Sequence, residues 1–164
     1  MAKRVFISYS HDSEAHRQHI IELADTLRRQ GVESVVDQYV ASPAQGWPRW
    51  MHDEIQKADH VLAVCTSTYK RRFEGHEVLG VGRGVTWEGQ LLTQILYDAN
   101  TLNRTIHAVQ FDGSSVEDIP LILRPYTRYS IPSEYERLYK QLTDQVESPP
   151  PVGRIIPMPP KQQP

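Results

Sequence analysis

Glu88 is a carboxylate at a position where the local pattern calls for an apolar residue. Four apolar residues follow it at three, four, seven and eight positions, which is the spacing of one face of an α-helix. They are Leu91, Leu92, Ile95 and Leu96. The pattern predicts an amphipathic helix over residues 85–97, with Glu88 in line with its apolar stripe. A carboxylate that faces a core or a cleft must be paired, neutralised or used in chemistry.

The ordinary role of a glutamate near the start of a helix is to complement the helix dipole. That position would also keep Glu88 ionised more easily than a site in the middle of a buried helix. The sequence alone leaves both the structural and the chemical interpretation of Glu88 open.

Other residue types that can carry chemistry lack the partners they would need. His16 and His19 share one helical face near His11, but no cysteine pair or HExxH motif accompanies them, so no metal site is predicted. Cys65 ends an apolar run without an identifiable base nearby, which is typical of an inert core thiol.

Five short apolar segments alternate with helical patterns, which is typical of an α/β protein with a parallel sheet covered on both faces. The expected strands are residues 5–8, 32–36, 61–65, 105–111 and 126–131, and the expected helices are 14–30, 48–57, 85–97 and 133–146. Residues 66–84 are predicted to form a long loop. The pattern predicts a flavodoxin-like three-layer fold with a five-stranded, mainly parallel sheet of strand order 2-1-3-4-5.

Open parallel sheets bind ligands beyond the carboxyl ends of their strands. In this chain those ends are residues 8–12, residues 37–47 and the segment from Thr66 onward. The start of the helix that carries Glu88 is expected at the same edge, so the sheet would bring these segments together.

Length and composition predict one globular domain over residues 1–146 and a proline-rich tail or linker over 147–164. The chain has 164 residues, and seven of its twelve prolines lie in the last 18. Such a tail cannot form a packed element, and it suggests a tether to a fused sensor domain or other partner. The proline pattern also admits an SH3-type ligand as an alternative to a passive linker.

Charge and hydropathy exclude several classes of partner. A net charge of −2 gives no overall attraction to nucleic acid or acidic lipid. No stretch approaches the roughly 20 apolar residues that span a bilayer, and no secretory signal is expected. A single cysteine suits the reducing cytoplasm. We therefore expect a cytoplasmic protein with no membrane or direct nucleic-acid partner.

The ordered set of motifs resembles the Toll/interleukin-1 receptor (TIR) superfamily, and in particular its SEFIR branch in the bacterial form. The resemblance spans about residues 4–146. The segments that carry it are Val5-Phe6-Ile7-Ser8-Tyr9-Ser10-His11-Asp12, Asp37-Gln38-Tyr39 through Pro43-Ala44-Gln45-Gly46-Trp47, Ala58 to Thr66, Gly84-Val85-Thr86-Trp87-Glu88-Gly89, Asp118-Ile119-Pro120 and Arg124-Pro125-Tyr126.

The resemblance implies two different functions. Many TIR domains are non-enzymatic scaffolds that associate with their own kind, often through the loop after the second strand. Others, common in bacterial antiphage defence, hydrolyse NAD to nicotinamide and ADP-ribose or a cyclic form when they assemble, with a glutamate on the helix after the third strand. Glu88 stands in that place. NAD would then be a substrate, and no cofactor is expected.

Cleavage of the ribose–nicotinamide bond passes through an oxocarbenium-like state, which one carboxylate can stabilise. Glu88 is the expected catalytic residue. Several NAD-cleaving relatives have a tryptophan four residues before this glutamate, where this chain has Gly84, and Trp87 is adjacent instead. The remaining expected substrate-binding residues are Phe6, Ser8, Tyr9, Ser10, Asp37, Trp47, Trp87 and Arg83.

The scaffold interpretation assigns a contact surface to the loop after the second strand. The expected interface residues there are Ala41, Pro43, Gly46 and Trp47. A third interpretation is a flavodoxin-like receiver or nucleotide-binding domain. A phosphorylation receiver requires an acidic pair after the first strand and an aspartate at the end of the third. The segments Ser8-Tyr9-Ser10 and Cys65-Thr66 do not supply these carboxylates.

Overall fold

The computed structural model describes residues 2–76, 83–98, 103–145 and 147–161. For residues 83–87 it describes the backbone but not the side chains. Residues 77–82 of the predicted loop, including Gly80 and Gly82, lie outside the described residues.

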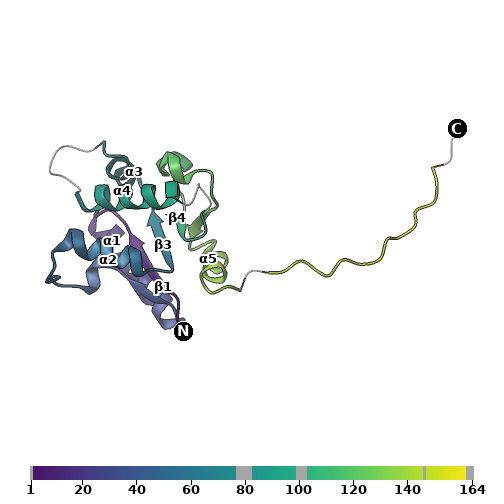
Figure 1. Ribbon diagram of the computed structural model, residues 1–164, viewed down its shortest axis with the longest axis horizontal. Helices are drawn as coiled ribbons and strands as arrows, with labels where there is room; N and C mark the ends of the chain where they lie inside the picture. The colour runs from purple at the N-terminus through teal and green to yellow at the C-terminus, as the bar shows by residue number, and fades with distance from the viewer. Residues whose placement is uncertain (1, 77–82, 99–102, 146, 162–164) are drawn as a thin grey trace.

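A five-stranded parallel sheet forms the centre of the domain, with strand order β2-β1-β3-β4-β5 (Figure 1). The predicted fold class and strand order are confirmed. The second, fourth and fifth strands are shorter than the predicted segments, the third has the predicted length but begins one residue earlier, and the first is one residue longer. The strands are β1 (Arg4–Ser8), β2 (Glu33–Val35), β3 (His60–Val64), β4 (Ile106–Phe111) and β5 (Arg128–Ile131).

Helices cover both faces of the sheet and enclose two apolar cores. Side chains of successive strand residues alternate between the faces, so Val5 and Ile7 pack on one side and Phe6 on the other. The first core lies against α1 (Glu14–Arg29) and α5 (Tyr135–Leu142). The second lies against α2 (Trp47–Lys57), α3 (Ser67–Phe73) and α4 (Arg83–Asp98). The described ranges also contain three short 3₁₀ helices: η1 (Asp37–Tyr39), η2 (Val116–Asp118) and η3 (Leu121–Leu123).

The prediction of a continuous loop over residues 66–84 is wrong, because α3 occupies Ser67–Phe73. Thr66 caps this helix by accepting a hydrogen bond from the backbone N–H of Tyr69 at 3.1 Å. Tyr69 and Phe73 are one turn apart and both are buried in the second core. Helices α3 and α4 pack side by side over this face (Figure 1).

Helix α4 begins earlier than the pattern predicted. It starts at Arg83, so Glu88 is its sixth residue and lies in the second turn, not the first. The last residues of the chain leave the domain: residues 147–161 form no helix or strand and extend away from it (Figure 1).

Candidate functional site

Glu88 is buried at the carboxyl edge of the sheet and is bound to the end of β1. Its side chain is 5% exposed. Ser8 Oγ donates a hydrogen bond to Glu88 Oε2, and the same Ser8 Oγ lies 2.8 Å from the hydroxyl of Tyr69 on α3. These three side chains join β1, α3 and α4 in one buried polar cluster.

The cluster has a defined order of donors. A serine hydroxyl carries a single proton, and Ser8 gives its proton to Glu88, so the Tyr69 hydroxyl must be the donor to Ser8 Oγ. Tyr69 is fully buried, and burial followed by the nearby Glu88 charge raises its pKa well above 10. The tyrosine therefore stays protonated and fixes the direction of the chain Tyr69–Ser8–Glu88.

Burial changes the ionisation of Glu88 in the direction opposite to the one expected from the sequence. The pKa of Glu88 is raised from 4.5 to about 8. Desolvation is the main cause, and the charge of Asp37 adds to it, while the hydrogen bond from Ser8 lowers the pKa by less. The expectation of an easily ionised carboxylate is wrong because Glu88 lies one turn inside the helix and is almost fully buried. At neutral pH Glu88 is mainly protonated.

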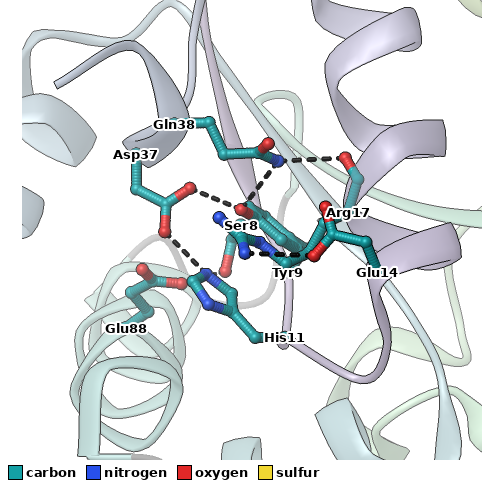
Figure 2. A network of polar contacts seen from close by, with 8 residues as sticks. All are labelled: Ser8, Tyr9, His11, Glu14, Arg17, Asp37, Gln38 and Glu88. Carbon is teal, nitrogen blue, oxygen red and sulfur yellow. Dashed lines mark hydrogen bonds and ion pairs between the residues drawn. The ribbon is translucent and has the colours of Figure 1, made fainter. Parts of the chain in front are cut away.

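A second polar network lies beside Glu88 and is centred on Asp37, the first residue of η1 (Figure 2). Asp37 Oδ1 accepts a hydrogen bond from the Tyr9 hydroxyl at 2.6 Å, and Asp37 Oδ2 lies 2.7 Å from His11 Nε2. Gln38 Nε2 donates to the Tyr9 hydroxyl and to the backbone oxygen of Arg17, each at 3.0 Å. The network fixes the loops that follow β1 and β2.

The neighbouring carboxyl groups of Asp37 and Glu88 have pKa values that are shifted in opposite directions. Burial alone would raise the pKa of Asp37, but hydrogen bonds from His11 and Tyr9 outweigh it and lower that pKa. Asp37 is therefore ionised at neutral pH, and its charge helps to keep Glu88 protonated. Pairs of carboxyl groups whose pKa values are driven apart in this way are typical of acid–base sites.

Gly89 allows α4 to approach α3 closely enough to place Glu88. A Cβ atom at this position would lie 2.5 Å from the backbone oxygen of Phe73 and 3.0 Å from its Cα. Since these are backbone atoms, a side chain at residue 89 could be accommodated only if the two helices moved apart. The glycine beside Glu88 thus has a packing role.

A pocket of about 320 Å³ opens onto Glu88 between α2 and α4. Met51, His52 and Ile55 line it from α2, and Gln90 and Leu91 line it from α4. Its volume is at the lower end of the roughly 300–1,000 Å³ range of small-molecule sites. It can hold one ring-sized part of a larger ligand next to the carboxyl group.

The predicted substrate-binding residues are only partly brought together. Ser8 binds Glu88 directly, and Asp37 acts on it electrostatically. Tyr9 packs in the first core, on the α1 side of the sheet, and reaches the site only through Asp37. Ser10 is buried and binds Asp12, with Thr66 Oγ1 at 3.3 Å.

The aromatic residues predicted to stack on a substrate form a row from the core to the surface. The ring of buried Phe6 packs edge-on against Trp50, with 5.9 Å between centroids, and Trp50 packs edge-on against Trp47 at 5.4 Å. Trp47 is 37% exposed and begins α2. Phe6 is therefore a core residue. The side chains of Arg83 and Trp87 lie outside the described residues.

The loop predicted as an assembly interface is open to solvent. Ala41 and Gly46 are exposed and Pro43 is half-buried. Gly46 has φ +84, a conformation that other residues rarely adopt, and it accepts the first backbone hydrogen bond of α2, from Trp50 N at 3.0 Å. The loop is thereby tied to the start of the helix that lines the Glu88 pocket.

Three contributors to the site were not assigned to it from the sequence. His11 and Gln38 were named within the motifs that carry the family resemblance but were given no individual role in the site, and Tyr69 lay in the predicted loop. Among the described residues, no three His, Cys, Asp or Glu side chains gather as metal ligands would. None of the helices in the described ranges is long and apolar enough to cross a membrane.

Comparison with known proteins gives one family and a consistent set of structures. The SEFIR domain family matches residues 3–142. A prokaryotic SEFIR domain is 24% identical, with a TM-score of 0.60 over 86% of this chain and 99% of that one. The SEFIR domain of IL-17 receptor B is 14% identical, with a TM-score of 0.65 over 88% of this chain and 96% of that one.

A metazoan TIR-STING receptor from C. gigas is 18% identical, with a TM-score of 0.60 over 85% of this chain and 40% of the receptor. No curated protein matches the chain. The similarities to solved structures establish a shared SEFIR/TIR fold. Because the family match covers most of the chain, the protein belongs to the SEFIR family. SEFIR and TIR domains are signalling modules that associate with domains of the same kind.

Proposed function

We propose that this SEFIR domain is an NAD nucleosidase that becomes active on assembly, with Glu88 as its essential carboxylate. The observation that carries the proposal is a buried glutamate held by Ser8 at the end of a pocket, with its pKa raised to about 8. A carboxylate that serves only the helix dipole lies at the surface of the first turn. Glu88 is instead desolvated beside a cavity, as catalytic groups are.

The proposed reaction breaks the bond between C1′ of the ribose and the ring nitrogen of nicotinamide. The bonding electrons leave with nicotinamide, which becomes neutral, and the ribose carries the positive charge. Water then adds to C1′ and releases a proton, which yields ADP-ribose. An internal nucleophile in place of water would give a cyclic product. Ionised Glu88 would stabilise the positive ribose and orient its hydroxyl groups.

The raised pKa gives the proposed enzyme a reason to be inactive alone. Glu88 is mainly protonated at neutral pH and is only 5% exposed. A cationic nicotinamide ring in the pocket would favour the ionised form, because an opposite charge lowers the pKa of a carboxyl group. The pocket of about 320 Å³ can hold only one part of NAD, so admission of the whole substrate requires α2 and α4 to separate, which we assign to assembly. The setting we propose is bacterial defence in the cytoplasm, with NAD depletion as the output and a tethered sensor as the trigger.

A scaffold without turnover is the second candidate. It is favoured by the hydrogen bond that Glu88 accepts from Ser8, which is itself bound to Tyr69, since this buried cluster has a structural use in joining β1, α3 and α4. In this case the exposed loop with Ala41, Gly46 and Trp47 would be the functional surface.

Nicotinamide release separates the two candidates. Purified full-length protein would be incubated with NAD either free or crowded on nickel-chelating vesicles through an N-terminal histidine tag. The proposal expects release only from the crowded sample, and its loss in Glu88→Gln. Asp98→Asn is the matched control, because Asp98 is an exposed acid on the same helix. If crowded wild type releases no nicotinamide, or if Glu88→Gln releases as much as wild type, the enzyme is excluded and the scaffold remains as the candidate function.

A further inference from the structure

An apolar groove with an acidic rim lies on the face of the domain away from the Glu88 pocket. It has a volume of about 620 Å³ and runs between α1 and the segment that joins β5 to α5. Leu23, Phe111, Ile131, Pro132 and Tyr135 form its apolar lining.

The charge of this groove is one-sided. Glu22 and Asp112 supply two carboxylates, and none of the described residues that line it is a lysine or an arginine. Asp112 is already bound by the Ser133 hydroxyl at 2.7 Å. Glu22 is exposed and accepts a long hydrogen bond of 3.4 Å from Gln18. Glu22 is therefore the carboxylate available to a basic ligand.

The C-terminal tail carries the complementary chemistry in an exposed, extended form. Ile155 is 96% exposed, Ile156 72% and Met158 79%. Four large aliphatic side chains in water, counting Val152 at 101%, are unusual for a passive linker. Arg154 stands within this apolar stretch, and no acidic residue lies between residues 148 and 161.

The proline spacing arranges the tail side chains on distinct edges. A polyproline II helix has three residues per turn, so Arg154, Pro157 and Pro160 share one edge. The adjacent edge carries Ile156 and Pro159, and the third edge carries the remaining apolar residues, Ile155 and Met158. At about 3.1 Å per residue, the stretch from Arg154 to Pro160 spans about 19 Å. One side of the tail thus presents two proline-containing ridges and a cation at its start.

We propose that the Arg154–Pro160 segment of one chain binds in this groove on a second copy of the chain. Polyproline II ligands are recognised by grooves lined with aromatic rings, which Phe111 and Tyr135 supply. Arg154 pairs with Glu22 at the rim, and the ridges with Ile156, Pro157 and Pro160 fill the apolar floor.

The second copy is the occupant because the tail leaves the domain on a stiff segment. The run Pro149-Pro150-Pro151 lies where the chain leaves the domain, two residues before Arg154, and it resists a turn back toward the same domain. Each chain can place its tail in the groove of one neighbour and receive the tail of another neighbour in its own groove. This is a head-to-tail contact, which can join many copies into a chain of molecules. The interaction would link copies independently of the reaction at Glu88.

Two charge reversals and their mixture test this arrangement by sedimentation velocity on full-length protein. Glu22→Arg disables the groove and Arg154→Glu disables the tail, and both positions are exposed, so folding is not at risk. Each variant alone should associate about tenfold or more weakly than wild type. An equimolar mixture should regain association, because each groove then meets a tail of opposite charge on the other variant.

The ridge assignment is tested by matched substitutions within the tail. Pro157→Ala should weaken association, whereas Met158→Gln, on the third edge, should leave it unchanged. If Glu22→Arg loses association but Arg154→Glu keeps it, another segment, such as the loop 41–47, binds in the groove, and the proposal is overturned. It would also be overturned by a mixture that stays monomeric, or by equal effects of Pro157→Ala and Met158→Gln.

Discussion

Replacing Glu88 with glutamine should stabilise the domain at neutral pH. Burial raises the pKa of Glu88 from 4.5 to about 8, while the same group in the unfolded chain keeps its ordinary value. The folded state therefore binds this proton more tightly. Its stabilising effect is fully present below pH 4.5 and is lost as the pH rises to about 8. Glutamine has nearly the same shape and carries no charge at any pH, so it avoids this loss.

The magnitude follows from the pKa difference. A shift of about 3.5 units at about 1.36 kcal/mol each corresponds to a total loss of about 5 kcal/mol, of which about 3 kcal/mol applies at pH 7. For a domain of this size, that is a rise of roughly 6–12 °C in Tm. Functional residues are often retained at a cost in stability, so a gain in stability on replacing Glu88 would fit a functional role for it.

Urea unfolding of wild type and Glu88→Gln from pH 5 to pH 8 measures the effect. The variant's advantage in unfolding free energy should grow by about 3.5 kcal/mol over this range. Histidine titrations fall in the same range, but they occur in both proteins and cancel in the difference. Asp98→Asn should show a difference within about 0.5 kcal/mol at every pH. A difference that stays constant with pH, or a variant less stable at pH 8, would refute the assignment of a buried, protonated Glu88.

Three further substitutions test the surroundings of Glu88. Asp37→Asn removes a nearby negative charge, so the pKa of Glu88 should fall below 8, as measured by carboxyl ¹³C NMR titration; an unchanged value would contradict the coupling. Gly89→Ala should destabilise the domain by about 1–3 kcal/mol in urea unfolding, because its Cβ meets the backbone of Phe73. Tyr69→Phe should cost about 1 kcal/mol, since one buried hydrogen bond is lost.

Matched controls separate these effects from general ones. Gly153→Ala, in the tail, has open space around its Cβ and should leave the unfolding free energy unchanged. Tyr97→Phe removes a hydroxyl from a residue that is 76% exposed on α4 and should also have no effect. If Gly89→Ala or Tyr69→Phe behaves like its control, the close packing or the donor order described above is wrong.

Periodicity predicted the sheet and the burial of Glu88 because both depend on short-range spacing. Apolar runs such as residues 61–65 identified central strands, and the alternation of strands and helices fixed the strand order that the structure confirms. The apolar stripe of α4 placed Glu88 on the side that faces α3 and β1. Helix α3 was missed because seven residues give too few turns for a repeat to show. The Thr66 cap and the spacing of Tyr69 and Phe73 were its available signals.

The contacts that define the site could not be predicted from the sequence. Ser8 and Glu88 are 80 positions apart, and His11 and Asp37 are 26 apart. Which of two adjacent residues, Ser8 or Tyr9, meets Glu88 depends on the face of the sheet that α4 covers. The pKa of Glu88 depends on how far α4 extends before it, and this start lay in a segment without an apolar repeat.

The loop proposed for assembly and the pocket proposed for catalysis share one element. Gly46 accepts the first hydrogen bond of α2, and Met51, His52 and Ile55 of the same helix line the pocket beside Glu88. Trp47, at the start of α2, contacts Trp50, which packs on Phe6 in the core. A partner that pulled on the loop would therefore move the wall of the pocket as a rigid helix. Helix α4 is held to α3 at Gly89 and to β1 at Ser8, and α2 is held to β1 by the ion pair between Glu54 and Arg4. In the proposed activation, a partner at the loop would have to supply the energy that loosens α2 from β1 before Glu88 is exposed.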